Sequence, residues 1–306
     1  MRAAVIGLGT MGPGMAATLA RGGMDVRCQD SSAEQMQRAE GGLQTALQVL
    51  ERIGGPAAPR RGTVNFDASL EAAVRDAEFV IEAVPERLDV KQQVFAELDR
   101  LAPPRAILAS NTSGIPITKL QEAVMRKDRV VGMHWSNPPH VIPVIEVIAG
   151  NHTSGATVET TKKVVADLGL LPVVVRKDVP GFVENRVLYA IMRECVSLVE
   201  KGVISAEELD TCVKWGIGFK LAVIGPMELL DVAGLDIYEA VAGYLNADLD
   251  NAAGVPSYIT NRTRERRLGM KTGRGIYEYT PERIEALRAA RAGKLVAVRK
   301  TLEGRE

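Results

Sequence analysis

The chain has 306 residues, of which 46% are hydrophobic and 25% charged, and its 38 lysines and arginines balance 38 aspartates and glutamates. A net charge of zero gives no sign of a general affinity for nucleic acid or an anionic membrane surface. No apolar run approaches the roughly 20 residues that span a bilayer. The chain begins with a predicted strand and a glycine turn, unlike a signal peptide.

The cysteines and histidines, three of each, are scattered along the chain. Their spacing fits neither a disulfide framework nor a metal site, so we expect no metal. This use of cysteine favours a reducing compartment, and we expect a cytoplasmic protein.

The first part of the chain alternates apolar, strand-like runs with helix-like segments, which is typical of a parallel sheet with crossover helices. Residues 2–6 predict the first strand, 11–21 its helix, 24–29 the second strand and 33–52 a long helix. A stretch rich in glycine and proline, residues 54–62, interrupts the pattern. Later strands are predicted at residues 79–84, 106–109, 130–134, 141–148 and 171–176, with a helix at 156–168.

The pattern changes at the segment Asp178-Val179-Pro180-Gly181. Beyond it, helices are predicted at residues 182–201, 206–215, 226–233, 237–245 and 281–302, with almost no strands. We therefore expect an α/β domain with a mostly parallel sheet over residues 1–178 and an all-α domain over residues 179–306. A mostly apolar helical domain often supplies a dimer interface, so we also expect a homodimer.

A glycine-rich turn, Gly7-Leu8-Gly9-Thr10-Met11-Gly12, joins the first predicted strand to the first predicted helix. In such a turn the first glycine permits the tight bend, the second lets the backbone approach a pyrophosphate, and the third lets helix and strand pack closely. The N–H groups at the start of the helix suit the phosphates. The motif alone is weak evidence, but its position between a strand and a helix predicts a dinucleotide-binding Rossmann domain.

An acidic residue, Asp30, closes the second predicted strand, 18 residues after Gly12. A carboxylate there accepts hydrogen bonds from the adenosine ribose hydroxyls and would repel a 2′-phosphate. No arginine adjoins it. We therefore expect NAD rather than NADP, the alternative being a glycine turn with an incidental aspartate.

Two polar residues in the later strands are candidates for acid–base chemistry. His134 lies at the carboxyl end of its predicted strand, where ligands bind in open α/β sheets. Glu146 lies within an apolar strand, where a carboxylate is costly unless it is paired. If the two strands are neighbours, Glu146 would accept from the imidazole and leave the other ring nitrogen to take a substrate proton. Taken singly, His134 would be a core histidine and Glu146 a solvent-facing residue.

Ordered motifs along nearly the whole chain resemble those of the 3-hydroxyacyl-CoA dehydrogenase family. Besides the glycine turn, they are IEAVPE at residues 81–86, SNTS at 110–113, HWSNP at 134–138, IEV at 145–147, DVPGFVENR at 178–186, GPMELLD at 225–231 and KTGRGIY at 271–277. The resemblance implies an NAD-dependent dehydrogenase with a Rossmann domain and a helical domain that dimerises.

The resemblance also implies roles for individual residues. His134 would be the general base and Glu146 its orienting partner, while Ser110 and Asn185 would contact the substrate oxygen. Three more residues would lie along the cofactor or between cofactor and substrate: Glu86, Lys91 and Asn137.

Two features bear on the substrate, which we expect to be a small molecule. Family members that act on CoA thioesters look to have a two-helix arm after the second strand, and here residues 54–62 make a poor second helix. Residues 133–140, 215–220 and 302–306 resemble a branch of the family that oxidises a pyridine aldehyde to the acid with NAD in vitamin B6 breakdown. Such a substrate needs no CoA clamp, and Trp135 or His140 would stack on its ring.

Three other functions stay open at this point. One is an L-3-hydroxyacyl-CoA dehydrogenase that uses the same residues. Another is a β-hydroxyacid dehydrogenase related to 6-phosphogluconate dehydrogenase, which would need a catalytic lysine where this chain has Asn185 and Arg186. The last is a non-enzymatic NAD-binding protein, which would not retain His134 and Glu146 together.

Overall fold

In the computed structural model, which describes residues 1–55 and 58–305, the chain divides into two compact units, Met1–Arg186 and a second unit from Val187 onwards. The first unit continues past residue 178, where the sequence predicts the domain boundary, so Asn185 belongs to it. The predicted α/β class, followed by helices, is confirmed.

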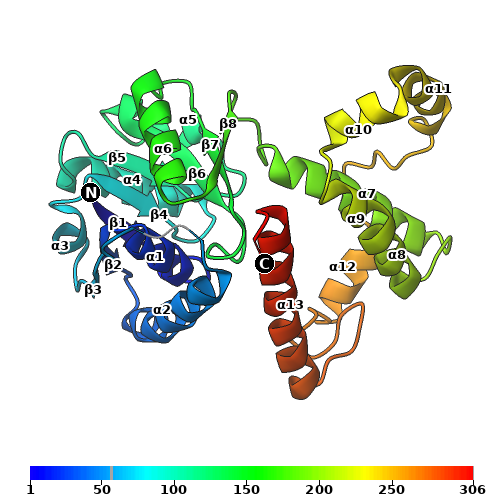
Figure 1. The fold of residues 1–306 in the computed structure, drawn as a ribbon, viewed down its shortest axis with the longest axis horizontal. Helices are drawn as coiled ribbons and strands as arrows, with labels where there is room; N and C mark the ends of the chain where they lie inside the picture. The colour runs from blue at the N-terminus through cyan, green and yellow to red at the C-terminus, as the bar shows by residue number, and fades with distance from the viewer. Residues whose placement is uncertain (56–57, 306) are drawn as a thin grey trace. The chain divides into compact units, whose positions relative to one another are not determined.

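The first unit is built on an eight-stranded sheet with the order β3-β2-β1-β4-β5-β6-β7-β8 (Figure 1). The strands are β1 Arg2–Ile6, β2 Asp25–Gln29, β3 Val64–Phe66, β4 Phe79–Glu82, β5 Ile107–Ser110, β6 Val130–Trp135, β7 Val144–Ile148 and β8 Leu171–Val175. All neighbouring pairs are parallel except β6 and β7, which are antiparallel. The carboxyl ends of β1, β4, β5 and β6 therefore meet at one edge of the sheet.

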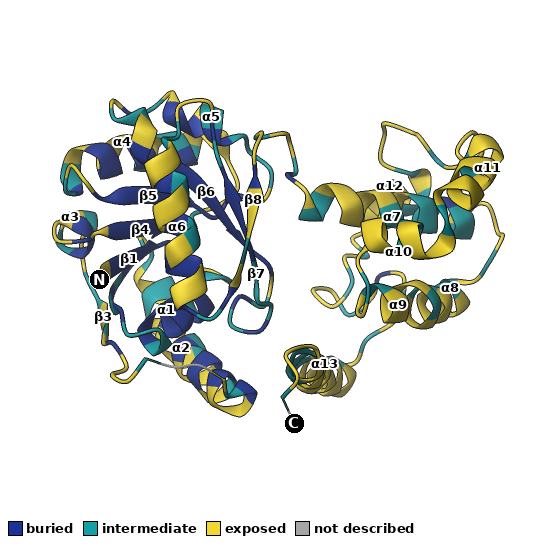
Figure 2. Cartoon of the chain, turned by 45° about the horizontal axis from the view of Figure 1, so that its top comes forward, coloured by how far each residue is buried: buried dark blue, intermediate teal, exposed yellow. Residues whose placement is uncertain are grey.

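Helices cover the sheet, and its central strands lie in the core of the unit, whereas the edge strands β3 and β8 are more exposed (Figure 2). The helices are α1 Gly12–Arg21, α2 Ala33–Ile53, α3 Leu70–Val74, α4 Leu88–Leu101, α5 Ile117–Gln121 and α6 Gly155–Asp167, with a short turn, η1, at Lys127–Arg129. Every residue of β4, β5 and β6 is buried, as expected for strands covered on both faces. This continuous burial explains why their sequences read as unbroken apolar runs.

The second unit consists of helices and their connections. Its elements are α7 Glu184–Glu200, which begins in the first unit, then α8 Ala206–Cys212, the π-helical turn η2 Val213–Gly218, α9 Phe219–Leu221, α10 Pro226–Ala233, α11 Leu235–Leu245, α12 Ser257–Arg264 and α13 Pro281–Leu302. Among the described residues, no helix is long and apolar enough to cross a membrane.

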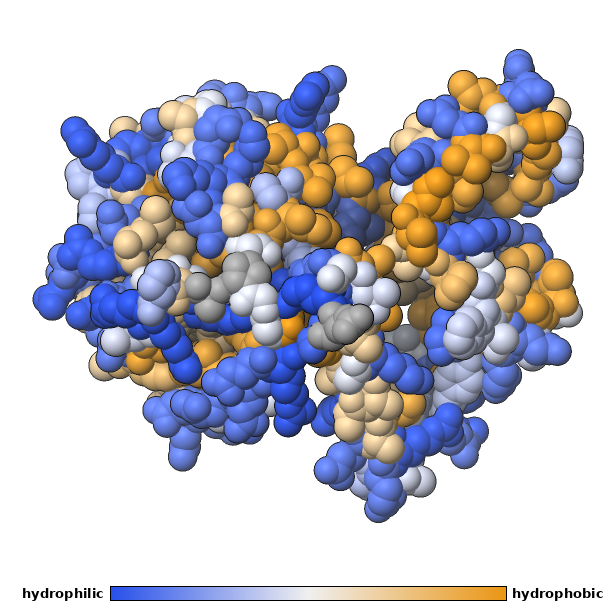
Figure 3. All heavy atoms as spheres, in the orientation of Figure 1, coloured by the Kyte–Doolittle hydropathy of each residue, from blue (hydrophilic) through white to orange (hydrophobic). Residues whose placement is uncertain are grey.

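The helices of the second unit leave much apolar surface uncovered. Helices α8 to α13 contain no buried position among the residues described. Hydrophobic spheres gather over α10 and α11 (Figure 3), where the exposed side chains include Met227, Val232, Leu235, Ile237 and Tyr244. A helix normally buries its apolar face against another element, so this surface is unusually apolar for one that faces solvent.

Candidate active site

The glycine turn after β1 has the geometry that its sequence predicts. Gly7 has φ +97°, and its N–H donates to the Gln29 carbonyl at 2.9 Å. A Cβ on Gly12 would lie 2.4 Å from the Gly7 oxygen, so the turn itself excludes a side chain there. A Cβ on Gly9 would meet nothing within 4 Å. The protein's own packing therefore does not require Gly9, and the open space in front of it fits an approaching pyrophosphate.

Asp30 joins the end of β2 to this turn. Its Oδ2 accepts from the Leu8 N–H at 2.7 Å, and its Oδ1 accepts from the Ser32 N–H at 2.8 Å. An ionised carboxylate has about four lone-pair positions, so both oxygens retain acceptor capacity for ribose hydroxyls. A cavity of about 580 Å³ borders the turn and α2, and its lining residues include Thr10, Asn137 and His140. The structure thus brings Asn137 to the glycine turn.

The antiparallel pairing of β6 and β7 sets His134 directly opposite Glu146. The His134 Nδ1 lies 2.8 Å from Glu146 Oε2, and the two residues are only 6% and 2% exposed. Glu146 Oε1 accepts two further hydrogen bonds, from the backbone N–H groups of Val183 at 2.9 Å and Glu184 at 3.1 Å. The predicted contact between the His134 imidazole and the Glu146 carboxylate is therefore present.

The charge state of Glu146 follows from these contacts. Burial raises the pKa of Glu146, but hydrogen bonds from His134, Val183 and Glu184 outweigh burial and hold that pKa below its ordinary value. An ionised Glu146 can only accept, so the hydrogen in the contact belongs to His134 Nδ1. The Nε2 atom is then the nitrogen that remains able to take a proton.

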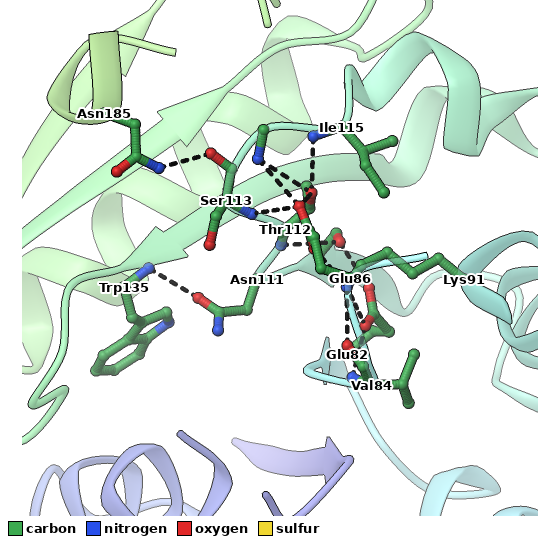
Figure 4. A network of polar contacts seen from close by, with 12 residues as sticks. Glu82, Val84, Glu86, Lys91, Asn111, Thr112, Ser113, Ile115, Trp135 and Asn185 are labelled. Carbon is green, nitrogen blue, oxygen red and sulfur yellow. Dashed lines mark hydrogen bonds and ion pairs between the residues drawn. The ribbon is translucent and has the colours of Figure 1, made fainter. Parts of the chain in front are cut away.

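A second buried network lies where β4 and β5 end (Figure 4). Glu82, the last residue of β4, accepts from the Ser110 hydroxyl at 2.6 Å and from Lys91 Nζ at 2.7 Å. Ser110 is fully buried, donates its hydroxyl hydrogen to Glu82 and accepts from the Thr112 N–H at 3.2 Å. Its oxygen keeps one lone pair, with which it could only accept from a substrate hydroxyl. Lys91 is 1% exposed and also donates to the Val84 carbonyl at 3.2 Å. Lys91 thus lies beneath the loop after β4 and fixes it.

Glu86 holds the loop that follows β5. Its Oε1 accepts from the Thr112 hydroxyl at 2.6 Å and from the N–H groups of Ser113 at 2.9 Å and Gly114 at 3.1 Å. Asn185 reaches the same loop, where its Nδ2 donates to the Ser113 carbonyl at 2.8 Å (Figure 4). The structure therefore collects Glu86, Ser110 and Asn185 around one loop.

Sequence reasoning gave no role to Glu82 or Asn111. Glu82 connects Ser110 to Lys91, and Asn111 accepts from the Trp135 N–H at 2.8 Å, which ties the loop after β5 to β6. Glu82 carries the same signal that marks Glu146, a carboxylate in an otherwise apolar strand that needs a partner. Nothing in the sequence distinguishes Asn111 from other polar loop residues.

The expectation that Trp135 stacks on a substrate ring is wrong. Successive side chains on a strand point to opposite faces of the sheet, and the Trp135 side chain is 1% exposed, inside the core. His140 packs over α1, because a Cβ on Gly14 would lie 2.7 Å from its Nδ1, and it lines the cavity beside the glycine turn. Burial lowers the pKa of His140, which favours a neutral ring.

The sequence predicts that residues 54–62 do not form a second helix after α2, and the described residues of this segment agree. Helix α2 ends at Ile53, and Gly54 and Gly55 follow with φ +67° and +81°. Residues 58–63 contain no helix, and Pro56 and Ala57 lie outside the described residues.

Comparison with known proteins identifies both parts of the chain. Residues 2–179 match the NAD-binding domain model of 3-hydroxyacyl-CoA dehydrogenase, and residues 181–279 match the C-terminal domain model. A protein from Mesorhizobium japonicum, 5-formyl-3-hydroxy-2-methylpyridine 4-carboxylate 5-dehydrogenase, is 56% identical over 99% of this chain and 98% of its own. The mitochondrial hydroxyacyl-coenzyme A dehydrogenase of Sus scrofa is 34% identical over 90% of each chain.

Solved structures give the same result. A crystal structure described as the 5-formyl-3-hydroxy-2-methylpyridine 4-carboxylic acid 5-dehydrogenase, an NAD⁺-dependent dismutase, is 55% identical with a TM-score of 0.97 over 100% of this chain and 99% of its own. The (S)-3-hydroxybutyryl-CoA dehydrogenase from Ralstonia eutropha is 32% identical with a TM-score of 0.72 over 91% of this chain and 99% of its own. With both family domains present in order, the chain belongs to the 3-hydroxyacyl-CoA dehydrogenase family and is an NAD-dependent dehydrogenase.

Proposed function

We propose that this protein oxidises 5-formyl-3-hydroxy-2-methylpyridine-4-carboxylate to the corresponding acid with NAD, in the degradation of vitamin B6. The observation that carries the proposal is the 56% identity, over 99% of the chain, to a protein with that named activity. The described part of the arm after β2 agrees with it, because a small aromatic acid needs no second helix to hold a CoA group.

Proton handling is assigned to the His134–Glu146 pair. Bound NAD supplies the hydride acceptor, and the residues of this chain supply binding and proton transfer. His134 Nε2 takes the O–H proton of the hydrated aldehyde as its C–H hydrogen leaves as hydride. Glu146, ionised and fixed by two backbone N–H groups, stabilises the imidazolium that results.

The remaining residues bind and orient. Asp30 and the glycine turn hold the dinucleotide, and Glu86 and Asn137 lie along it. Lys91 is too deeply buried to line this path and acts from beneath it, by fixing the loop after β4. Ser110 accepts from a substrate hydroxyl, and Asn185, held by Ser113, adds a donor at the same loop. One of these two groups accepts a hydrogen bond and the other donates one. This combination suits a hydrate, which presents both a hydroxyl hydrogen and an oxygen lone pair.

We also propose that the protein is a cytoplasmic homodimer that buries the apolar surface of its second unit. Helices α10 and α11 expose several large hydrophobic side chains, among them Met227 and Val232 at 73% and 72%. A second copy of the chain is the partner of matching character, since isologous interfaces are the commonest in soluble oligomers.

The substrate is tested by incubating the purified protein with NAD and the pyridine aldehyde while NADH absorbance is followed. We expect steady NADH formation, and a loss of about 10²–10⁴-fold in rate in His134→Ala, because the general base is removed. Acetoacetyl-CoA with NADH is the comparison substrate. Brisk turnover of the thioester, with none of the aldehyde, would establish the 3-hydroxyacyl-CoA alternative instead.

Two glycine variants test the cofactor turn separately from the fold. Gly9→Ala should keep the thermal midpoint of the NAD-free protein, since its Cβ enters open space, and weaken NAD binding by at least about tenfold as it blocks the pyrophosphate. Gly12→Ala should lower the thermal midpoint as well, because its Cβ collides with the Gly7 carbonyl, at a cost of about 1–3 kcal/mol. Calorimetry with NAD and thermal melts measure both. Unchanged NAD affinity in Gly9→Ala would place the dinucleotide elsewhere.

Analytical ultracentrifugation at micromolar concentration tests the dimer. We expect a species of twice the 33.0 kDa chain mass. Charged substitutions at Met227 and Val232 should shift it towards the chain mass, because they would desolvate charge in the interface. A monomer in the unmodified protein would refute the proposed assembly.

A further inference from the structure

A second carboxylate, Glu184, stands beside the His134–Glu146 pair. It is the first residue of α7, and the Ser136 hydroxyl donates to its Oε2. Ser136 lies two residues beyond His134 and is buried. One side-chain nitrogen or oxygen from each of His134, Glu146 and Glu184 lies within 4.8 Å of the others. Such a group is compact enough to hold a metal ion, but the 2.8 Å contact between Nδ1 and Oε2 is a hydrogen bond within the pair.

The carboxylates of Glu146 and Glu184 differ in how many hydrogen bonds they already accept. Glu146 accepts from one imidazole and two backbone N–H groups, so three donors hold it. The Glu184 side chain accepts from Ser136 alone among the described residues. An ionised carboxylate accepts about four hydrogen bonds, so Glu184 retains room for a water molecule or a proton. It is also only partly buried, whereas Glu146 is closed off.

Aldehyde oxidation releases two protons and uses a second proton acceptor when both leave within the site, whereas alcohol oxidation releases only one. Converting an alcohol to a carbonyl releases one hydride and one proton. Converting an aldehyde to a carboxylate consumes one water, passes one hydride to NAD⁺ and releases two protons. One proton leaves the water as its oxygen bonds to the carbonyl carbon, which gives the anion of the hydrate. The other leaves the remaining hydroxyl as hydride departs, so the product forms as the carboxylate. A single imidazole can hold only one of them.

We propose that Glu184, positioned by Ser136, is this second acceptor. It orients the water that adds to the aldehyde carbon and takes a proton from it, while His134 takes the proton that leaves as hydride departs. This inference rests on the proposed function. Reduction of the same aldehyde to the alcohol by NADH needs one proton and no water. Glu184 is therefore expected to contribute to oxidation of the aldehyde and not to its reduction.

The test compares both reactions of one aldehyde in the unmodified protein and in Glu184→Gln. The amide keeps the shape of the side chain and the backbone N–H that donates to Glu146, so the His134–Glu146 pair is retained. We expect the ratio of oxidation rate (aldehyde with NAD) to reduction rate (aldehyde with NADH) to fall by at least about tenfold, since a proton acceptor typically contributes about 10²–10⁴-fold. Ser136→Ala should lower the ratio less, because the carboxylate remains.

Glu159→Gln is the matched control, since Glu159 is an exposed carboxylate on α6 whose side chain pairs with Lys162 and with no other residue in the described part of the chain. Its ratio should equal that of the unmodified protein. An unchanged ratio in Glu184→Gln, whether both rates fall together or neither does, would overturn the role of Glu184 and leave the proposed function standing. Failure of the unmodified protein to oxidise the aldehyde would overturn both.

Discussion

A negative charge in the interior of a sheet is the constraint around which this site is built. A buried carboxylate without hydrogen-bond donors costs several kcal/mol of folding free energy. Such a group would take up a proton, or the structure around it would unfold. Glu146 avoids this cost because β7 runs antiparallel to β6 and sets an imidazole opposite it, while the chain entering α7 supplies two backbone N–H groups. The same contacts that make the charge tolerable fix the orientation of His134.

The parallel part of the sheet extends this arrangement along its carboxyl edge. The glycine turn follows β1, Asp30 follows β2, and β4 and β5 end at Glu82 and Ser110, so side chains distant in the sequence become neighbours. Donors and acceptors pair along this edge, where the buried Lys91 fixes the loop after β4 and the more exposed Glu86 fixes the loop after β5. Rigid strands and paired loops hold such groups within the small tolerances that proton and hydride transfer require.

Much of this could be predicted from the sequence, because the signals are local. The glycine turn between strand and helix, the aspartate that closes the second strand and the glutamate in an apolar strand each reveal a constraint within a few residues. The partnership of His134 with Glu146 followed from one further assumption, that two successive strands are adjacent. The short elements β3, α3 and α5 were missed because three to five residues give too little periodicity, and the longer α4 was missed as well.

The remaining contacts depend on tertiary structure. Ser136 and Glu184 are 48 positions apart and meet only because α7 begins beside β6. Trp135 follows a catalytic candidate directly, yet the alternation of the strand turns it into the core, which adjacency in sequence conceals. The way Glu82 connects Ser110 to Lys91 likewise needs the register of two strands and a helix.

The hydrogen on the His134 ring offers the most direct test of the account. The chain has three histidines, so ¹⁵N NMR of histidine-labelled protein, with His134→Gln to assign the signal, can read the tautomer at a pH where the ring is neutral. We expect a hydrogen on Nδ1, shared with Glu146, and none on Nε2. A neutral ring with its hydrogen on Nε2 would contradict it, because no nitrogen would then be available to accept the substrate proton.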